Sequence, residues 1–216
     1  MAGTTLFDLD GTLTTLDSAG AFLKATIAKS PPRLLCALLL LPIAAPLLLV
    51  ARTRAFGASV FFWLASVGKS HDRFFRELRT FVRRTFEGEQ RVNARVLSML
   101  RERLRDGHRV AIVTGAPTSL VRCLARVHGI RASYIGSRLR PGFRGLVCKT
   151  HCIGERKVER VRQVVGLERW DEVFSDSLLD LPLMRRARVV WLVRPSARTL
   201  RRVRALLPPG IEVRVL

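Results

Sequence analysis

The stretch that decides the fold is Thr4-Thr5-Leu6-Phe7-Asp8-Leu9-Asp10-Gly11-Thr12, near the start of the chain. A short apolar run that ends in two carboxylates and a Gly-Thr pair predicts a buried strand over residues 4–10 that stops in a loop. Beyond the strand end, Asp8 and Asp10 can turn toward one pocket. Clustered acids in such a place cost free energy unless a cation or a reaction uses them. An ordinary Asp-rich turn is the alternative, and potential partners elsewhere in the chain argue against it.

The composition of the chain bounds its size and its neighbours. Its 216 residues are enough for one well-buried domain with a modest insertion. The formal net charge is +21, with 38 basic against 17 acidic residues. Such a balance indicates a polyanionic neighbour, which is nucleic acid, an anionic membrane or a phosphorylated substrate. Arginine supplies nearly all of the positive charge, as a genome-wide bias also would, so the charge alone does not choose among these partners.

The four cysteines form no disulfide framework. They are Cys36, Cys123, Cys148 and Cys152. Two of them flank His151 and resemble half of a zinc site, but the sequence has no second pair to complete four ligands. We therefore expect reduced thiols in a protein that faces the cytosol.

An acid-free segment follows the first strand. Between Ser18 and His71 there is no Asp or Glu, and the segment contains two apolar runs, Leu34 to Val50 and Ala55 to Gly68. A helix that spans a membrane needs about 20 apolar residues, so the first run is marginal and the second is too short. Pro42 and Pro46 are expected to interrupt helix hydrogen bonding in the first run.

The topology of this segment favours contact with a membrane surface over crossing it. A two-span hairpin would place Arg52 and Arg54 on the far side, against the positive-inside tendency. We expect a re-entrant or interfacial helical hairpin whose basic residues meet an anionic surface. A buried helical cap that packs only on itself is the alternative. A cap of that kind normally carries mixed charges on its outer face, which this segment lacks.

The rest of the chain alternates between helices and strands. This pattern predicts an α/β fold, with a Rossmann-like parallel sheet covered by helices on both faces. In such sheets the ligand pocket lies beyond the carboxyl ends of the strands. We expect a catalytic core at residues 1–16 and 91–216, and a helical cap inserted at residues 17–90. The expected helices are 71–89, 92–104, 119–128 and 155–165, the expected strands are 109–113, 172–174 and 189–193, and a hairpin is expected over 134–147 with its turn at Pro141-Gly142.

Chemistry-bearing residues follow three of the expected strands, and a lysine opens a helix between the last two. Together they supply the groups that phosphoryl transfer through a covalent aspartyl phosphate requires. Carboxylates, a carbonyl and water suit magnesium, and hydroxyl, amide and ammonium groups can hold phosphate oxygens. The residues are Asp8 and Asp10, Thr114 and Gly115, Lys157, and Asp176 and Asp180.

Four motifs in this order resemble those of the haloacid dehalogenase superfamily of phosphatases. They are Asp8-Leu-Asp10-Gly-Thr, Val113-Thr114-Gly115, Lys157 and Ser175-Asp176-Ser-Leu-Leu-Asp180. Within the superfamily the chain is similar to the phosphoserine phosphatase branch, and more closely to bacterial membrane-associated phosphatases of the phosphatidylglycerophosphatase C type. The narrower resemblance is carried by the apolar insertion, Trp63 to His71, Ile112 to Pro117, Cys152 to Val158 and Phe174 to Asp180.

The resemblance implies a role for each motif residue. Asp8 would be the nucleophile, and Asp10 the acid that protonates the leaving alkoxide and then activates water. Thr114 and Gly115 would bind the phosphoryl oxygens. Asp176 would hold Mg²⁺ together with Asp8 and the carbonyl of Asp10. In addition, Lys157 would neutralise the aspartyl phosphate, and Asp180 would support the metal shell.

Two features of the motifs leave choices open. Lys149 is the rival for the lysine role, and we prefer Lys157 because it lies at the start of a helix. The fourth motif reads Ser-Asp-Ser (Ser175 to Ser177), where the phosphoserine branch often has Gly-Asp-Gly. This difference leaves the metal ligand in place and weakens any transfer of that branch's substrate.

The resemblance implies a magnesium-dependent phosphatase on the cytoplasmic side of a bacterial inner membrane. The expected substrate is an anionic phospholipid, phosphatidylglycerophosphate, with no nucleic-acid partner and no obligate protein partner. A phosphatase of a soluble phosphomonoester such as phosphoserine is the first alternative. A non-catalytic basic protein that binds membrane or nucleic acid is the second, although no nucleic-acid-binding motif is present. The candidate headgroup contacts are Arg52, Arg54, Lys69 and Arg73.

Overall fold

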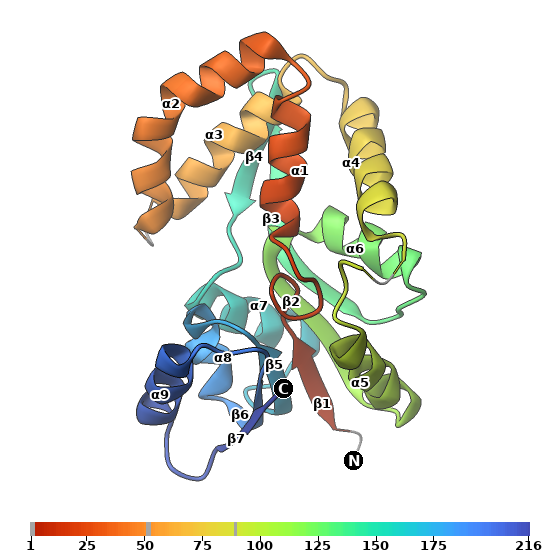
Figure 1. Cartoon of the computed structure of the whole chain (residues 1–216), viewed down its shortest axis with the longest axis vertical. Coiled ribbons are helices and arrows are strands. Elements are labelled where there is room, and N and C mark those ends of the chain that lie inside the picture. Colours follow the sequence, from red (N-terminus) through yellow and green to blue (C-terminus); the bar gives the residue numbers. More distant parts are fainter. Residues whose placement is uncertain (1–2, 51–52, 89) are drawn as a thin grey trace.

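A twisted seven-stranded sheet forms the centre of the protein (Figure 1). The computed structural model describes residues 3–50, 53–88 and 90–216. Strand order is β4-β3-β2-β1-β5-β6-β7, with β4 antiparallel to β3 and the other neighbouring pairs parallel. The expectation of a mostly parallel α/β sheet is confirmed. The strands are β1 (Thr4–Phe7), β2 (Arg109–Pro117), β3 (Ser133–Gly142), β4 (Gly145–Thr150), β5 (Trp170–Ser175), β6 (Ala187–Leu192) and β7 (Glu212–Val215).

Strand β1 lies in the middle of the sheet, between β2 and β5. Phe7 pairs with Ile112 of β2 on one side and with Phe174 of β5 on the other. The chain therefore continues from β1 to both sides of the sheet, which makes β1 the topological switch point where α/β proteins bind ligands. The loops after β1, β2 and β5 meet at one edge.

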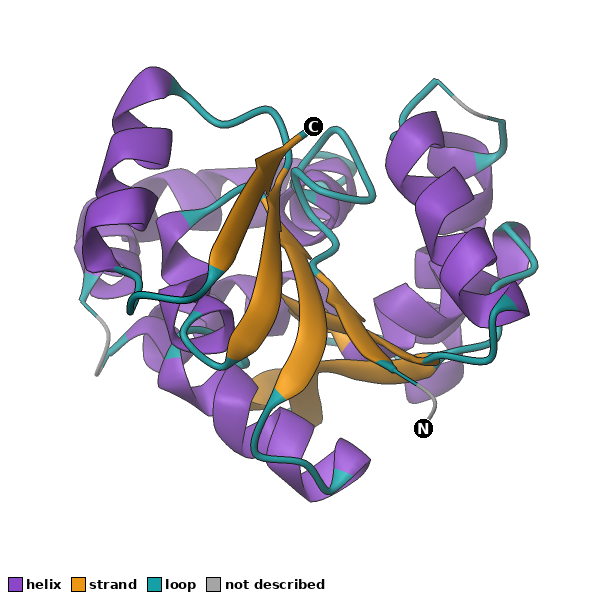
Figure 2. Cartoon of the chain, turned by 90° about the horizontal axis from the view of Figure 1, so that it is seen from below, coloured by secondary structure: helices purple, strands orange, loops and turns teal. Residues whose placement is uncertain are grey.

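Helices cover both faces of the sheet (Figure 2). Side chains alternate along each strand, so Phe7 and Ile112 pack with α5 and α6, whereas Leu6 and Val113 pack with α7, α8 and α9. Strands buried on both faces are typical of parallel sheets. The helices of the core are α5 (Ala94–Arg105), α6 (Thr118–Val127), α7 (Glu155–Val165), α8 (Leu181–Met184) and α9 (Ala197–Leu206), with a short 3-10 turn η1 (Leu178–Asp180).

Four helices form a cap between β1 and α5, beyond the carboxyl ends of the strands (Figure 1). Asp17 caps the first of them by accepting a hydrogen bond from the Gly20 amide at 3.0 Å. Phe22 packs edge-to-face against Phe74, which joins the first and last cap helices. The division at residues 16/17 and 90/91 stays a prediction. The cap helices are α1 (Ser18–Ile27), α2 (Pro31–Leu49), α3 (Arg54–Ser66) and α4 (His71–Phe86).

The two prolines of the first apolar run interrupt the hydrogen bonding of its helix without ending the helix. Helix α2 continues through both Pro42 and Pro46. Each proline removes one backbone hydrogen bond, and most of this helix is exposed, so the freed carbonyls do not have to be satisfied inside a packed core. Among the described residues α2 is the one helix long and apolar enough to cross a membrane, with a mean hydropathy of 2.1. This property is weak support for a membrane helix.

The chain leaves the core for the cap at residues 13–15 and returns at residues 91–93, and these two segments lie side by side. Thr14 forms an isolated bridge with Val92. The amide of Thr15 donates to the carbonyl of Arg91 at 3.1 Å, and the amide of Asn93 donates to the carbonyl of Leu13 at 2.9 Å. The incoming and outgoing chains are therefore bonded to each other.

The β3–β4 hairpin provides a second connection between core and cap. It extends from the sheet and packs beside α3 (Figure 1). The hydroxyl of Ser59 accepts a hydrogen bond from the amide of Cys148 at 3.0 Å, and the hydroxyl of Ser66 accepts one from the amide of Leu146 at 2.7 Å. The Trp63 indole donates to the carbonyl of Phe143 at 2.8 Å.

The turn of this hairpin lies two residues beyond its expected place. Gly142 still pairs with Gly145, so Phe143 and Arg144 make the turn, and Arg144 has a positive φ of 49°. Pro141 remains in the strand because it sits in the hairpin's outer part, where the missing amide is tolerated. The sequence pattern also gave no sign of α9 and β7, where arginines break up the apolar residues.

Candidate active site

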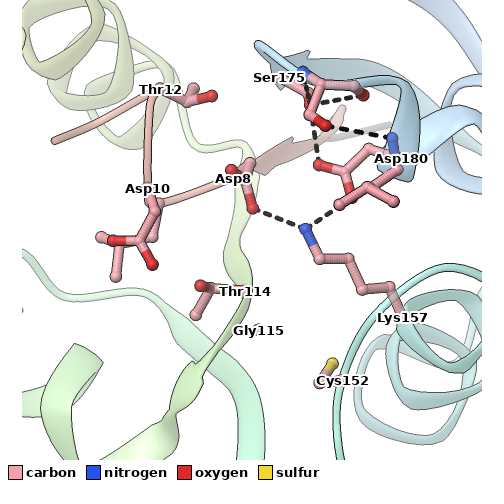
Figure 3. A network of polar contacts seen from close by, with 12 residues as sticks. Asp8, Asp10, Thr12, Thr114, Gly115, Cys152, Lys157, Ser175 and Asp180 are labelled. Carbon is pink, nitrogen blue, oxygen red and sulfur yellow. Dashed lines mark hydrogen bonds and ion pairs between the residues drawn. The ribbon is translucent and has the colours of Figure 1, made fainter. Parts of the chain in front are cut away.

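Asp8 follows directly after β1 and lies in a buried ion-pair network (Figure 3). Its amide donates to the carbonyl of Phe174 at 2.9 Å, which extends the pairing with β5 and fixes the backbone. Its carboxylate lies 2.6 Å from the ammonium of Lys157, and that ammonium lies 2.6 Å from Asp180. Ser175 donates to the second oxygen of Asp180 at 2.8 Å. One buried cation is thus held between two carboxylates.

The electrostatics of this network favour a protonated lysine. Burial lowers the pKa of Lys157, but the carboxylates of Asp180 and Asp8 raise it more, so the net shift is upward. Burial raises the pKa of Asp8 to about 8, against the lowering effect of Lys157. The two shifts have different causes: burial disfavours the charged form of Asp8, and the two neighbouring carboxylates favour the charged form of Lys157.

Asp10 points away from this network, toward the start of α1 (Figure 3). Its carboxylate accepts the amide of Ser18 at 2.9 Å and the hydroxyl of Thr14 at 3.3 Å. Burial raises the pKa of Asp10 to about 6, although both hydrogen-bond partners lower it. A carboxyl group with such a pKa can give and take a proton near neutral pH.

Gly11 brings the loop after β1 against the loop after β5. It has a φ of +83°, and a Cβ at this position would overlap the carboxylate of Asp176. Thr12 donates to the same carboxylate at 3.4 Å. Burial raises the pKa of Asp176. Glycine is therefore required here both by the backbone conformation and by the close approach of the acid.

The donor set at this edge fits Mg²⁺, which prefers oxygen ligands. Asp8 and Asp176 are two carboxylates whose pKa values burial raises, so a further cation would favour their ionised forms. In the described part of the chain no group of three His, Cys, Asp or Glu side chains could hold a metal, so Mg²⁺ would need the carbonyl of Asp10 and water besides these two carboxylates. The expectation that Asp10 is a ligand therefore applies to its carbonyl, since its carboxylate binds Ser18.

Thr114 and Gly115 follow the central part of β2 and face the same edge. The Thr114 hydroxyl accepts the amide of Ala116 at 3.0 Å, so its hydrogen remains for donation to another group. Ser137 of β3 donates to the carbonyl of Gly115 at 2.6 Å and accepts the amide of Cys152 at 3.0 Å. This serine ties the strand end that carries Thr114 to the segment that leads into Lys157.

Several positioning contacts were missed by the sequence analysis. Ser18, Ser137 and Ser175 each orient a motif residue through one hydrogen bond. Serine is common in loops and helix starts, so only the contact across the fold distinguishes these three. Ser175 stands where the phosphoserine branch often has glycine, and its hydroxyl adds a hydrogen bond to Asp180.

The remaining candidates lie elsewhere. Lys149 is exposed on β4, which leaves Lys157 as the lysine beside Asp8. Cys148, His151 and Cys152 form no metal cluster with other described residues.

Of the candidate headgroup contacts, Arg52 lies outside the described residues. Arg54 donates to the carbonyl of Leu48 at 2.6 Å. The Lys69 side chain is only 5% exposed and its ammonium lies 2.6 Å from Glu77, so it stabilises the cap and is poorly placed for a headgroup. Arg73 is exposed and also pairs with Glu77.

A central acid-bearing strand, a lysine on a later helix and a cap inserted after the first strand define a Rossmann-like α/β protein with an acidic site at the switch point of its sheet. The sequence matches the haloacid dehalogenase-like hydrolases over residues 5–185, and the chain belongs to that family. The expectation of an enzyme of the hydrolase class is confirmed.

Solved structures share the fold over nearly the whole chain. A protein with unknown function from Bordetella pertussis Tohama I is 21% identical, with a TM-score of 0.73 and coverage of 99% of this chain and 98% of its own. A phosphoserine phosphohydrolase-like protein from Francisella tularensis is 14% identical, with a TM-score of 0.60 and coverage of 96% and 100%. A phospho-aspartyl intermediate analogue of phosphoserine phosphatase is 12% identical, with a TM-score of 0.59 and coverage of 99% and 93%.

Proposed function

We propose that this hydrolase is a phosphomonoesterase that works through a phosphorylated Asp8. The observation that carries the proposal is the buried Asp8–Lys157–Asp180 network at the end of β1, with Asp10 held separately by Ser18. The ionised carboxylate of Asp8 attacks phosphorus, and the bond from phosphorus to the ester oxygen breaks. Asp10 gives its proton to the departing alkoxide. In the second step Asp10 takes a proton from water, which attacks phosphorus, releases inorganic phosphate and restores Asp8.

The surrounding groups bind and neutralise the phosphoryl group. Thr114 donates its hydroxyl hydrogen, and the amide after it adds a second donor. Lys157 balances the charge that accumulates on the phosphoryl oxygens. Mg²⁺ bound by Asp8, Asp176 and the carbonyl of Asp10 would supply further positive charge at the phosphoryl oxygens. Asp180 keeps Lys157 in place and is itself held by Ser175.

The proposed substrate is a phosphomonoester of a lipid, with phosphatidylglycerophosphate as the leading candidate. Helix α2 supports this choice because it is uncharged from Leu34 onward and presents large exposed apolar side chains beside the site. Contiguous apolar surface of this kind on one helix indicates a membrane or a partner surface. With no acidic residue from Ser18 to His71, the cap suits an anionic bilayer, which for a bacterial enzyme would be the cytoplasmic face of the inner membrane.

A screen of phosphate release tests both parts of this proposal. Phosphatidylglycerophosphate in mixed micelles is compared with glycerol phosphate and phosphoserine, with and without magnesium. We expect release to require magnesium and to favour the lipid by more than about tenfold, which corresponds to about 1.4 kcal/mol. A smaller preference, or a preference for phosphoserine, would support the soluble-substrate alternative.

The variant Asp8→Asn tests the nucleophile. We expect phosphate release to fall to the background because an amide cannot form the acyl phosphate, while circular dichroism shows a folded protein. Full activity in this variant would remove Asp8 from the mechanism. Absence of release from every phosphomonoester by the unaltered protein would favour the non-catalytic binding protein.

A further inference from the structure

A half-open apolar pocket of about 780 Å³ lies between the cap and the core, and α1, α2 and α3 supply most of its lining. This is a volume typical of small-molecule sites, which range from about 300 to 1,000 Å³. Of its 21 lining residues, four have polar or charged side chains, namely Asp10, Asp17, Lys24 and His151. A bound water needs two to four polar partners, so most of this lining cannot hold ordered water.

One end of the pocket is the candidate active site. Asp10 lines it from the loop after β1, and Gly115 and Ala116 line it from the carboxyl end of β2. Asp10 is the acid that faces the leaving group in the proposed reaction. The leaving group of a phosphomonoester bound at Asp8 would therefore lie at this end of the pocket.

From that end the pocket follows the length of α1. Ala19, Leu23 and Ala28 line it, and the nine steps from Ala19 to Ala28 span about 14 Å at 1.5 Å per residue. The far part reaches the start of α2, where Leu34 lines the pocket. The shape is that of an elongated apolar space with its polar groups at one end and along the side.

Helix α2 uses two different faces. Leu34, Leu38 and Leu41 line the pocket and are 41%, 58% and 46% exposed, so the pocket is open to solvent along this side. Leu35, Leu39 and Ile43 do not line it, and they are 59%, 68% and 66% exposed. These last three residues recur every four positions and so share a stripe of the helix. One helix thus presents apolar side chains both to the pocket and to the outside.

We propose that this pocket binds a hydrocarbon chain of the substrate, so that the lipid's chain enters the cap while its phosphate lies at Asp8. The inference rests on the proposed lipid phosphomonoesterase function and adds where the chain binds. The apolar lining excludes a charged or sugar-like leaving group from most of the space. The outer face of α2 would meet the bilayer from which the chain comes.

The binding test uses the full-length Asp8→Asn protein, in magnesium buffer, with no membrane present. Isothermal titration calorimetry measures the affinity for alkyl phosphate monoesters from butyl to dodecyl, each below its micelle concentration. We expect affinity to rise by up to about fourfold per methylene, as full burial of hydrocarbon implies, and to level off once the pocket is full.

Two substitutions that fill the pocket test its location. Ala58→Phe acts from α3, where Ala58 lines the pocket and is 8% exposed, and Ala19→Leu acts from α1. We expect both to flatten the dependence of affinity on chain length. The matched control is Ala205→Leu on the exposed face of α9, which should keep the full dependence. Thermal unfolding of each variant checks that it folds, and Ala19→Leu carries the test if Ala58→Phe does not.

The outcomes separate the two proposals. If lipid phosphate is hydrolysed in micelles but alkyl phosphates bind equally at every length, the chain stays in the bilayer and this inference is overturned while the function stands. If both filled variants keep the full dependence, the chain binds elsewhere and the inference is again overturned. If phosphoserine is hydrolysed and no lipid or alkyl phosphate is bound or hydrolysed, the lipid function itself fails.

Discussion

At the scale of single residues, Gly11 has no space for a side chain. Its positive φ and the nearby Asp176 carboxylate both exclude a Cβ. We predict that Gly11→Ala lowers phosphate release about 100-fold, because a displacement of an active-site group by about 1 Å can have that effect. Steady-state kinetics on a soluble phosphomonoester provides the measurement. Gly107→Ala is the control, because Gly107 also has a positive φ but no atom lies within 4 Å of its Cβ position. A loss of activity in Gly11→Ala that Gly107→Ala does not share comes from the displaced Asp176 carboxylate and not from backbone strain alone.

Ser18 contacts the proposed acid through its backbone amide and its side chain. Ser18→Pro removes both the amide that donates to Asp10 and the hydroxyl, and proline is compatible with the first position of α1. We predict that kcat falls about tenfold or more while KM changes little, since a hydrogen bond to a charged group contributes about 1.5–3 kcal/mol. Ser18→Ala keeps the amide and removes the hydroxyl alone, so its loss of kcat should be smaller. Equal losses in both variants would mean that the amide contributes nothing to the orientation of Asp10.

The motif residues could be predicted from the sequence because each follows a recognisable strand or opens a helix. Asp8 and Asp176 directly follow β1 and β5, Thr114 lies near the carboxyl end of β2, and the parallel sheet brings these three strand ends together. Ser137 is different. Its two hydrogen bonds reach Gly115 and Cys152, 22 and 15 residues away, so nothing in its neighbourhood along the chain indicates its role.

At the scale of elements, α2 has an outer stripe that should meet a bilayer. We predict that the double variant Leu39→Ser with Ile43→Ser lowers partition into anionic vesicles at least tenfold, because it removes two large apolar side chains from the interface. Vesicle co-sedimentation gives the measurement. Leu206→Ser on α9, where the leucine is also exposed, is the matched control. Unchanged partition of the double variant would remove this stripe from the membrane proposal.

In the same helix, α2, hydrophobic periodicity cannot show which face is buried. The run from Leu34 to Val50 is apolar on every side, so no hydrophobic face could be assigned to it, and the helix continues through Pro42 and Pro46. The amphipathic helix α4 was predicted within three residues of its observed end because its apolar stripe contrasts with charged neighbours. Strand β7 was missed because its four residues alternate apolar and charged on an exposed edge.

At the scale of the whole molecule, the side chain of Glu172 on β5 links its own strand to α5, β6 and β1. Glu172 is 7% exposed and accepts bonds from Arg103 on α5, Trp191 on β6 and Thr5 on β1. Burial raises the pKa of Glu172, but the hydrogen bonds from Arg103 and Trp191 lower it more, and the net shift is downward. Its ionised form therefore stabilises the fold.

The pH dependence of stability follows from this shift. The pKa of Glu172 is lower in the folded protein than in the unfolded chain, where it is about 4.3. Glu172 therefore stabilises the fold fully at pH values above the unfolded pKa, and this stabilisation is lost as the pH falls through the folded pKa. We predict that Glu172→Gln lowers the free energy of unfolding at pH 7 by about 1–3 kcal/mol, and that the difference narrows toward pH 3.

Urea unfolding at several pH values measures the effect. Glu102→Gln is the control, because Glu102 also pairs with Arg103 but is largely exposed, and it should change stability little at any pH. A constant difference between Glu172→Gln and the unaltered protein across this range would contradict the assignment.

The two connections between core and cap have a consequence for how turnover proceeds. A lid that swung open about the paired segments at Thr14 and Val92 would have to break the bonds of Ser59, Trp63 and Ser66 to the β3–β4 hairpin. At about 0.5–1.5 kcal/mol each, these bonds together oppose opening. We therefore expect the cap to stay seated on the core through the catalytic cycle, so that substrate enters and product leaves without an opening of the whole cap.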